Sequence, residues 1–384
     1  MLLMAQNKTW DVIVIGGGLV GSSIAYHLAK SGIQTLLVEQ GELASGASGA
    51  NFGNIQVQDA DFGFSLELTI QGAACCAELE TKLDFDLDYG KAGSLLLIES
   101  DHQHAMMVDR LRHLEAAGLR VKLLGQDDLI QLEPFLNPET VIGGLYHPDE
   151  GQLNPFKLAH AYALRGLQKG LDVRFHTPVT KIIAQNGRVR GVDTHDGFLP
   201  AGIVVLATGA WTRPLGLTAG VEIPAEWVHG EAIITEPLDP YINNAMSSAS
   251  FFEETASVEG TIVAFAMKQR REGNVMLGEA TTATPRLDRD VAENSIKGVA
   301  VEGRRRLPRL KQTTILRSWG IPVAHTVDNL PLLGPVNKVE NLYVAAGLKS
   351  TIVLTPIVGP IMAKMITDQE IDPRFAEFSP SRLI

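Results

Sequence analysis

Residues 11–39 read DVIVIGGGLVGSSIAYHLAKSGIQTLLVE, and the first part of this stretch carries a glycine motif. An apolar run, Val12 to Ile15, predicts a strand, and Gly16, Gly18 and Gly21 follow it at the spacing G-x-G-x-x-G. Gly16 permits a tight turn out of the strand. Gly18 lets backbone N–H groups approach a pyrophosphate at the positive end of a helix, and Gly21 lets that helix pack closely on a sheet.

The second part of the stretch completes a βαβ unit. Residues 19–30 predict a helix, residues 35–38 predict a second strand, and Glu39 follows that strand directly. A carboxylate at this place accepts hydrogen bonds from a ribose diol, and its charge repels a 2′-phosphate. Strand, glycine turn, helix, strand and acid together indicate a dinucleotide site, and they leave open whether the dinucleotide is NAD or FAD.

The composition limits the remaining possibilities. With 384 residues, the chain exceeds one typical core, so we expect two domains or one domain with a large insertion. A net charge of −11 argues against a nucleic-acid surface. The only cysteines, Cys75 and Cys76, are adjacent, which suits a reducing compartment. We find no signal peptide and no apolar stretch of membrane-spanning length, so we expect a cytoplasmic protein without a membrane span.

The rest of the chain alternates helix and strand signals at first and then turns mainly to strands. Residues 41–55 are rich in Gly, Ser and Asn, which permits close backbone approach to a cofactor, and residues 143–155 are rich in turn formers. Helices are predicted for residues 65–82, 101–117, 126–133, 156–169, 291–305 and 352–367. Strands are predicted for residues 95–98, 173–175, 179–184, 189–194, 203–207, 229–235, 261–267, 275–279 and 342–346.

These signals predict an α/β fold (α+β overall), in which the chain leaves a nucleotide-binding domain twice and returns to it twice. We expect the nucleotide-binding domain to be discontinuous, with residues 1–82, 141–220 and 321–384. Residues 83–140 and 221–320 would form a second, substrate-binding domain on an antiparallel sheet. Near the C-terminus, residues 347–351 (GLKST) connect a buried strand to a helix. Their N–H groups and the helix N-terminus suit a partial negative charge, as on a reduced flavin ring.

Several segments together resemble the D-amino-acid-oxidase-like family of FAD-dependent amine oxidoreductases. The resemblance rests on the glycine motif with Glu39, the loop 45–48, residues 145–155, the strand and turn 205–211 (VLATGAW), residues 319–328 with Pro331 and Gly334, and residues 344–347. Within the family, SGASGANFGNIQVQD with GLKSTIVLTPIVG looks most like the β (FAD-bearing) subunit of opine (octopine or nopaline) oxidases and dehydrogenases.

The resemblance implies a Rossmann-like FAD-binding domain of the glutathione-reductase or p-hydroxybenzoate-hydroxylase type, with a second antiparallel-sheet domain over the flavin. Glu39 would bind the adenosine ribose, Val179 would meet the adenine through its backbone, and Gly347 to Thr351 would contact the flavin pyrimidine edge. The implied cofactor-binding residues are Gly16, Gly18, Leu19, Val20, Gly21, Glu39, Gln40, Ser45, Ser48, Gly49, Asn51, Val179, Thr208, Gly209, Trp211, Gly334, Gly347, Leu348, Lys349, Ser350 and Thr351.

Three departures from the family pattern bear on the cofactor and the substrate. Simple amino-acid oxidases of the family hold the substrate carboxylate with an arginine in the C-terminal turn, where this chain has Lys349, and a lysine cannot form the bidentate fork. No cysteine follows Cys76, so we expect non-covalent FAD. The usual Arg-Gly-Gln of the first substrate-domain strand is His229-Gly230-Glu231 here.

The implied reaction is oxidation of a C–N bond α to a carboxylate. The Cα hydrogen would pass as hydride to flavin N5, and the imine would be hydrolysed to a 2-oxo acid and an amino acid if the substrate is an opine. The candidate substrate contacts are Lys349, His229, Asn54, Glu231 and Lys268, with Asn51 beside them. Each has a structural alternative, such as a loop-shaping role for Asn54. We expect no metal site.

The resemblance also implies partners. The opine subunits work with α- and γ-type partner chains that pass electrons onward, and FMN could bind at the partner interface. One alternative is a stand-alone glycine or D-amino-acid oxidase, or a D-hydroxyproline or proline dehydrogenase. Another is a non-catalytic, flavin-holding subunit.

Overall fold

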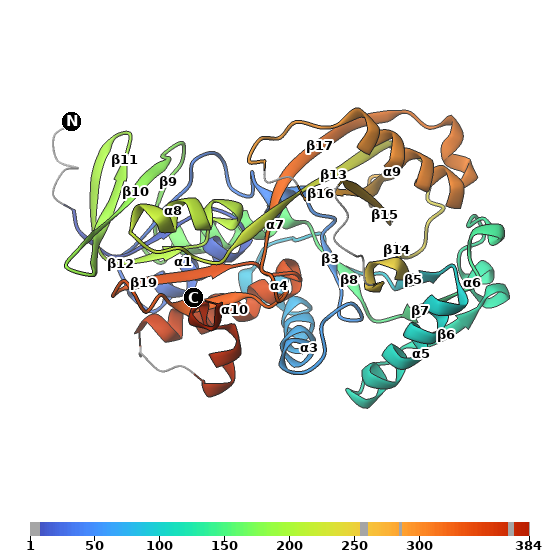
Figure 1. Cartoon of the computed structure of the whole chain (residues 1–384), viewed down its shortest axis with the longest axis horizontal. Helices are drawn as coiled ribbons and strands as arrows, with labels where there is room; N and C mark the ends of the chain where they lie inside the picture. Colours follow the sequence, from blue (N-terminus) through green and yellow to red (C-terminus); the bar gives the residue numbers. More distant parts are fainter. Residues whose placement is uncertain (1–7, 254–259, 284–285, 368–371, 384) are drawn as a thin grey trace.

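The computed structural model describes residues 8–253, 260–283, 286–367 and 372–383. Figure 1 shows two lobes side by side, each with a sheet of its own, and the first and last described segments belong to the same lobe. Of the helices in the described ranges, none is long and apolar enough to cross a membrane.

The first sheet carries the glycine motif and is parallel at its centre. Its parallel strands run in the order β19-β12-β1-β2-β9. β18 pairs antiparallel with β19 at one edge, and β10 and β11 form an antiparallel meander with the first half of β12. The bounds are β1 (Trp10–Ile15), β2 (Thr35–Val38), β9 (Asp172–Arg174), β10 (Val179–Gln185), β11 (Arg188–Thr194), β12 (Gly197–Leu206), β18 (Leu332–Pro335) and β19 (Leu342–Ala346).

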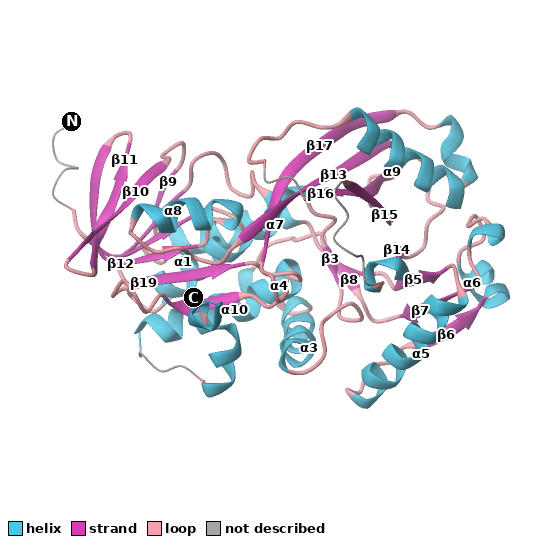
Figure 2. Ribbon diagram, in the orientation of Figure 1, coloured by secondary structure: helices cyan, strands magenta, loops and turns pink. Residues whose placement is uncertain are grey.

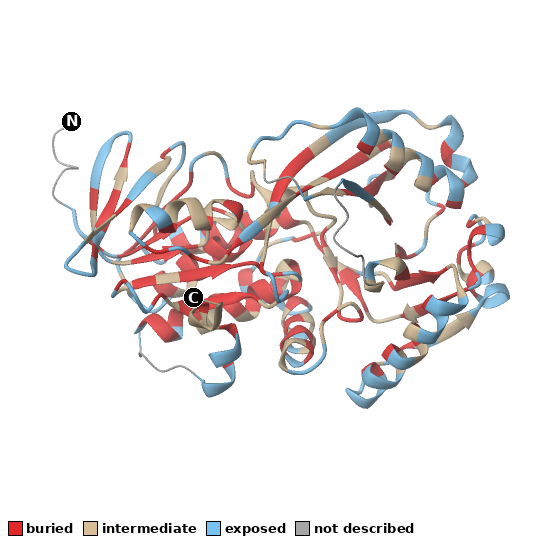
Figure 3. Cartoon of the chain, viewed as in Figure 1, coloured by how far each residue is buried: buried red, intermediate tan, exposed pale blue. Residues whose placement is uncertain are grey.

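Both faces of this sheet are covered at its centre, which explains why β1, β2 and β19 are near-continuous apolar runs. In β1, Val12 and Val14 join a core with the helices of the lobe, whereas Ile13 and Ile15 join a core with the meander, because successive side chains point to opposite faces. Figure 2 shows the helices of this lobe, and Figure 3 shows its central strands as mostly buried, whereas the meander strands β10 and β11 are partly exposed. The helices are α1 (Leu19–Lys30), α3 (Phe64–Cys76), α4 (Leu79–Leu83), α7 (Pro155–Leu167), α8 (Thr212–Thr218) and α10 (Thr351–Thr367).

The second sheet is mainly antiparallel, in the order β17-β13-β16-β15-β14-β5-β7-β6, with a parallel pairing between β14 and β5. One face packs against α9 through residues such as Phe265, Leu277 and Val299, and the β5–β7 end packs against α5 through Met107 and Leu114. The bounds are β5 (Ser94–Ile98), β6 (Lys122–Gly125), β7 (Gly143–His147), β13 (Glu226–Pro237), β14 (Ala245–Ser248), β15 (Thr261–Gln269), β16 (Asn274–Thr282), β17 (Ile315–His325), α5 (Asp101–Ala116), α6 (Gln126–Leu132) and α9 (Glu293–Arg306).

A small third sheet lies between the lobes, in the order β3-β8-β4. It brings the glycine-rich loop after β2 next to the segment before α7. Its strands are β3 (Asn54–Ile55), β4 (Gly90–Lys91) and β8 (Gly151–Gln152), and the short helix α2 (Ala47–Ala50) precedes it. Short 3₁₀ helices cover residues 138–140, 209–211, 249–252, 308–312, 373–378 and 380–383.

The expected α/β class with a second, mainly antiparallel sheet is confirmed. The helix expected over residues 65–82 is instead α3 and α4, and this break lets Leu79 and Leu83 pack in the same core as Cys76. Residues 143–155, expected as turns, contain β7 and β8. The two-domain division stays a prediction. The sheet pairings would assign β7 to the second domain, because it pairs with β5 and β6.

Gly72 tests the packing of α3 on α10. A Cβ at Gly72 would lie 2.1 Å from the Val353 carbonyl oxygen, so the helices approach closely only without a side chain here. We expect Gly72→Ala to lower the free energy of unfolding by about 1–3 kcal/mol, despite the better helix propensity of alanine. The measurement is denaturant unfolding, with the exposed Gln71→Ala as control. Equal stability of the two variants would contradict this packing.

Candidate functional site

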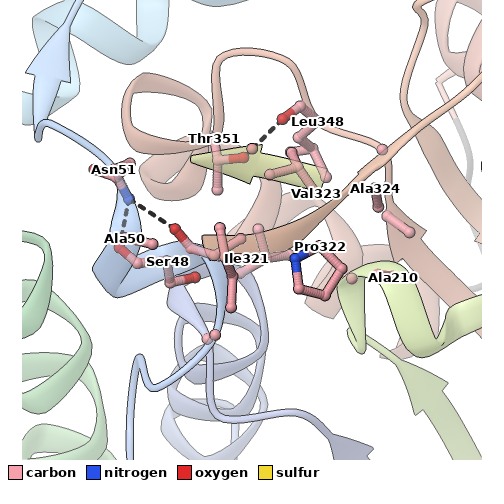
Figure 4. A pocket seen from close by; sticks show the side chains of 18 of the residues that line it. Ser48, Ala50, Asn51, Ala210, Ile321, Pro322, Val323, Ala324, Leu348 and Thr351 are labelled. Atoms are coloured by element: carbon pink, nitrogen blue, oxygen red, sulfur yellow. Dashed lines mark hydrogen bonds between the residues drawn. The ribbon is translucent and has the colours of Figure 1, made fainter. Parts of the chain in front are cut away.

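A cavity of about 790 Å³ lies where the two sheets meet, and segments far apart in the sequence line it. The lining includes the glycine turn after β1, the loop around α2, the turn after β12, the inner side of β13, β16 and β17, and residues 345–353. Figure 4 shows how closely these segments converge: Ser48, Ala50 and Asn51 face Ile321 to Ala324 of β17, with Leu348, Thr351 and Ala210 around them.

The glycine turn forms one end of the cavity. Gly16 has a φ of +107°, and a Cβ there would lie 2.4 Å from the Ala207 carbonyl oxygen, so only glycine fits. Glu39 is buried, and its carboxylate accepts hydrogen bonds from the N–H groups of Gly17 (2.6 Å) and Gly41 (2.8 Å). The carboxylate therefore shapes the backbone on which a dinucleotide would lie.

Most of the residues expected at the cofactor line this cavity. They are Gly16, Gly18, Val20, Glu39, Gln40, Ser45, Ser48, Asn51, Val179, Thr208, Gly209, Trp211, Gly347, Leu348, Lys349, Ser350 and Thr351. Leu19, Gly21, Gly49 and Gly334 are not among the lining residues.

Three of those exceptions lie behind the wall and act through packing or positioning. A Cβ at Gly21 would lie 1.9 Å from the Gly16 carbonyl oxygen, and one at Gly49 would lie 2.3 Å from the Ala44 carbonyl oxygen. The N–H of Leu19 donates to Ser48 Oγ at 3.0 Å. Gly334 lies in β18 and does not line the cavity. Its φ of +122° is a backbone conformation that favours glycine.

The loop around α2 is tied to both lobes. Asn51 donates to the carbonyl of Ser48, and its Oδ1 accepts the N–H of Gly53 at 2.8 Å, so it shapes the loop besides lining the cavity. From the second lobe, the indole N–H of Trp319 on β17 donates to the carbonyl of Ala50 at 3.0 Å. Asn54 also lines the cavity and lies 3.5 Å from the Gln56 side chain.

The C-terminal turn forms another wall. Gly347 has a φ of +69°, and the Thr351 hydroxyl donates to the carbonyl of Leu348 at 2.7 Å at the start of α10. The ammonium of Lys349 lies 3.1 Å from Asp61, and both side chains are about half exposed. Lys349 is therefore at the cavity, as expected, but its charge already has a partner.

His229 and Glu231 on β13 belong to a buried ionic cluster. Arg286 contacts both, at 3.0 Å from His229 Nδ1 and 3.2 Å from Glu231 Oε1, and Glu231 Oε2 accepts the N–H of Ala292 at 3.1 Å. Glu231 lines the cavity, whereas the His229 side chain is fully buried and does not. The His229 ring therefore lies behind the cavity wall, and its expected contact with substrate stays a prediction.

Lys268 is also behind the wall. Its ammonium donates to the carbonyl of Phe52 at 3.0 Å, and burial lowers its pKa to about 7. The side chain ends on the loop backbone and is not among the lining residues, and its expected substrate contact stays a prediction.

Sequence reasoning missed three charged residues of the cavity. Asp59 and Glu279 line it, and burial raises the pKa of both carboxyl groups. Arg289 lines it and donates to the carbonyl of Ser45 at 2.8 Å. Asp59 ends the stretch SGASGANFGNIQVQD, which supports the family resemblance, but it was not among the expected site residues. Glu279 and Arg289 belong to no motif, so no local signal could have identified them.

The arrangement fits an extended dinucleotide. One continuous cavity joins the glycine turn to the C-terminal turn, and at Gly16 a side chain would close the approach of backbone to ligand. The residues able to hold FAD are thus the lining residues of the glycine turn, the α2 loop, the turn after β12 and residues 347–351. Among the residues described, no group of three or more His, Cys, Asp or Glu could hold a metal ion.

Comparison with known proteins identifies the family. A family model described as FAD dependent oxidoreductase matches residues 11–367. The chain belongs to this family of FAD-dependent oxidoreductases. The expected family is confirmed, and the family model indicates that the dinucleotide is FAD and not NAD.

Similar proteins match over nearly the whole chain. Glycine oxidase of Geobacillus kaustophilus is 27% identical, over 99% of this chain and 98% of the relative. Hydrogen cyanide synthase subunit HcnC of Pseudomonas aeruginosa is 24% identical, over 98% and 97%. The crystal structure of L-proline dehydrogenase from P. horikoshii has a TM-score of 0.88 at 25% identity and covers 98% of both chains.

Glu39 tests the nucleotide end of the cavity. In Glu39→Gln, one carboxylate oxygen becomes an amide that faces a backbone N–H, so we expect FAD affinity to fall roughly tenfold or more. Titration of the apoprotein with FAD measures this. Glu42→Gln is the control, because Glu42 is exposed and pairs with the surface residue His176. Equal affinity of the two variants would contradict the role of Glu39.

Proposed function

We propose that this FAD-dependent oxidoreductase oxidises the C–N bond of an amino acid or N-substituted amino acid, α to the carboxylate. The observation that carries the proposal is the single cavity shared by the dinucleotide fingerprint, the C-terminal turn and the second sheet. Relatives of similar length are a glycine oxidase and an L-proline dehydrogenase, both named for amino-acid substrates.

When bound, FAD would supply a two-electron acceptor for the hydrogen lost from the substrate Cα as hydride. The chain's own residues would then hold the substrate. Lys349 is proposed to contact the carboxylate, and it would exchange its contact with Asp61 for the substrate. Asn54 and Glu231 lie in the same lining and could orient the amine. The apolar segment Ile321 to Ala324 would limit water around the reacting bond.

Within this class we propose an opine as substrate. An opine carries two or more carboxylates, and octopine also carries a cationic side chain. The cavity offers a basic and an acidic side chain, Lys349 and Glu231, that suit these two kinds of group. The amine loses a hydride and a proton to become an imine, and water then releases a 2-oxo acid and an amino acid. We also propose that α- and γ-type partner chains receive the electrons, with FMN at the interface. The subunit status of HcnC supports an assembly of this kind. The free cysteines Cys75 and Cys76 agree with a cytoplasmic location.

A stand-alone oxidase or dehydrogenase of glycine, D-amino acids, D-hydroxyproline or proline is the second candidate. The end-to-end match to glycine oxidase of Geobacillus kaustophilus favours it. A non-catalytic, flavin-holding subunit is the third.

The deciding experiment is an anaerobic reduction screen of the purified FAD-loaded chain. We expect octopine or nopaline to bleach the flavin absorption, and glycine, D-alanine, proline and sarcosine to leave it unchanged. Bleaching by glycine or D-alanine with rapid peroxide release in air would favour the second candidate. An absence of bleaching by every amine, with and without partner chains, would leave the non-catalytic subunit.

Lys349 is tested with the substrate found in that screen. We expect Lys349→Met to raise the substrate KM about tenfold or more, because a charge contact to the carboxylate is lost, and to change kcat less. Steady-state or stopped-flow flavin reduction measures both. The exposed Lys338→Met serves as control. An unchanged KM in Lys349→Met would assign Lys349 to its surface contact with Asp61 alone.

A further inference from the structure

The acidic residues of the cavity differ in whether their charges are compensated. Glu39 is satisfied by two backbone N–H groups. Glu231 is satisfied by Arg286 and by the N–H of Ala292. In the described ranges, the Asp and Glu residues that line the cavity are Glu39, Asp59, Glu231 and Glu279.

Asp59 is the third of these residues, and its charge is opposed by neighbouring cations. Burial raises its pKa, while the positive charges of Lys349 and Arg110 act in the opposite direction. Arg110 is itself fixed by bonds to the carbonyls of Gln58 and Ala60. Asp59 thus has two cations near it, although the charge of Asp61 also raises its pKa.

Glu279 is different. Its side chain is exposed, and it lines the cavity. Burial raises its pKa, and only the Thr281 hydroxyl acts to favour the ionised form. No ion pair joins Glu279 to any residue that the structure describes. A carboxylate that opens into the cavity without an ion-pair partner is available to a ligand that supplies the positive charge.

The backbone next to Glu279 is tightly packed against the cavity residue Phe52. A Cβ on the preceding Gly278 would lie 2.9 Å from the ring of Phe52, a residue that also lines the cavity. Glu279 belongs to β16 of the second sheet, whereas Lys349 belongs to the turn before α10. A negative and a positive side chain therefore enter one cavity from different walls.

We propose that Glu279 binds a cationic group of the substrate, a guanidinium or an ammonium remote from the oxidised C–N bond, and so selects for substrates with a positively charged side chain. This inference rests on the proposed function, because it assumes that the cavity binds the amine that is oxidised. A guanidinium could donate two parallel hydrogen bonds to the carboxylate, and the enclosed setting would make the pair stronger than on a surface.

The test compares two ligands that cannot undergo the proposed reaction, 4-guanidinobutyrate and heptanoate, which share a carboxylate and a similar length. Their dissociation constants are measured from the change in flavin absorption of the FAD-loaded chain. We expect wild-type protein to bind 4-guanidinobutyrate at least about tenfold more tightly than heptanoate. Glu279→Gln should abolish this preference and leave heptanoate binding within about twofold. Glu272→Gln, on the exposed turn between β15 and β16, is the control.

Equal binding of the two ligands by wild-type protein, or a preference that survives Glu279→Gln, would overturn the inference. FAD content and melting temperature verify that the variant is folded. If Glu279→Gln does not bind FAD, Glu279→Asp keeps the charge on a shorter arm and should reduce the preference in part; an undiminished preference would again overturn it. A different result would contradict the proposed oxidation alone. In that case no amine would bleach the flavin, although wild-type protein prefers 4-guanidinobutyrate and Glu279→Gln loses this preference.

Discussion

The close approach of three backbone segments at the glycine turn is the constraint on which the structure depends. A side chain at Gly21 would meet the carbonyl of Gly16, and a side chain at Gly16 would meet the carbonyl of Ala207. The end of β1, the start of α1 and the end of β12 can therefore converge only through glycines. Because ligands of such sheets bind beyond the carboxyl ends of the strands, this convergence also places the cavity.

The second lobe completes the cavity by holding the loop around α2. Three donors from that lobe end on carbonyl oxygens of the loop: Arg289 on Ser45, Trp319 on Ala50 and Lys268 on Phe52. The buried cluster of His229, Glu231 and Arg286 in turn fixes the segment that carries Arg289. His229, Glu231 and Lys268, which were expected to contact substrate, thus also help to connect the second lobe to the loop around α2.

The sequence predicted what depends on local pattern. The glycine turn, Glu39, the turn after β12 and the C-terminal turn were found because each follows a buried strand and each has a recognisable spacing. What it could not predict is pairing at a distance. The sequence around Lys349 does not predict its contact with Asp61, and the sequence around His229 does not predict its contact with Arg286. These partners meet only through the tertiary fold. Glu279 was missed for the same reason: a lone acid in a strand has no motif, and its meaning comes from lining the cavity without an ion pair to any described residue.

A single cavity, with the dinucleotide fingerprint at one end and the C-terminal turn at another, is proposed to hold one non-covalent FAD. Heat or acid denaturation of the purified, FAD-loaded chain tests it most directly, by quantifying and identifying the flavin released. The account predicts close to one FAD per chain, recovered in the supernatant. A colourless protein that takes up NAD instead of FAD, or flavin that stays attached to the precipitated chain, would contradict it.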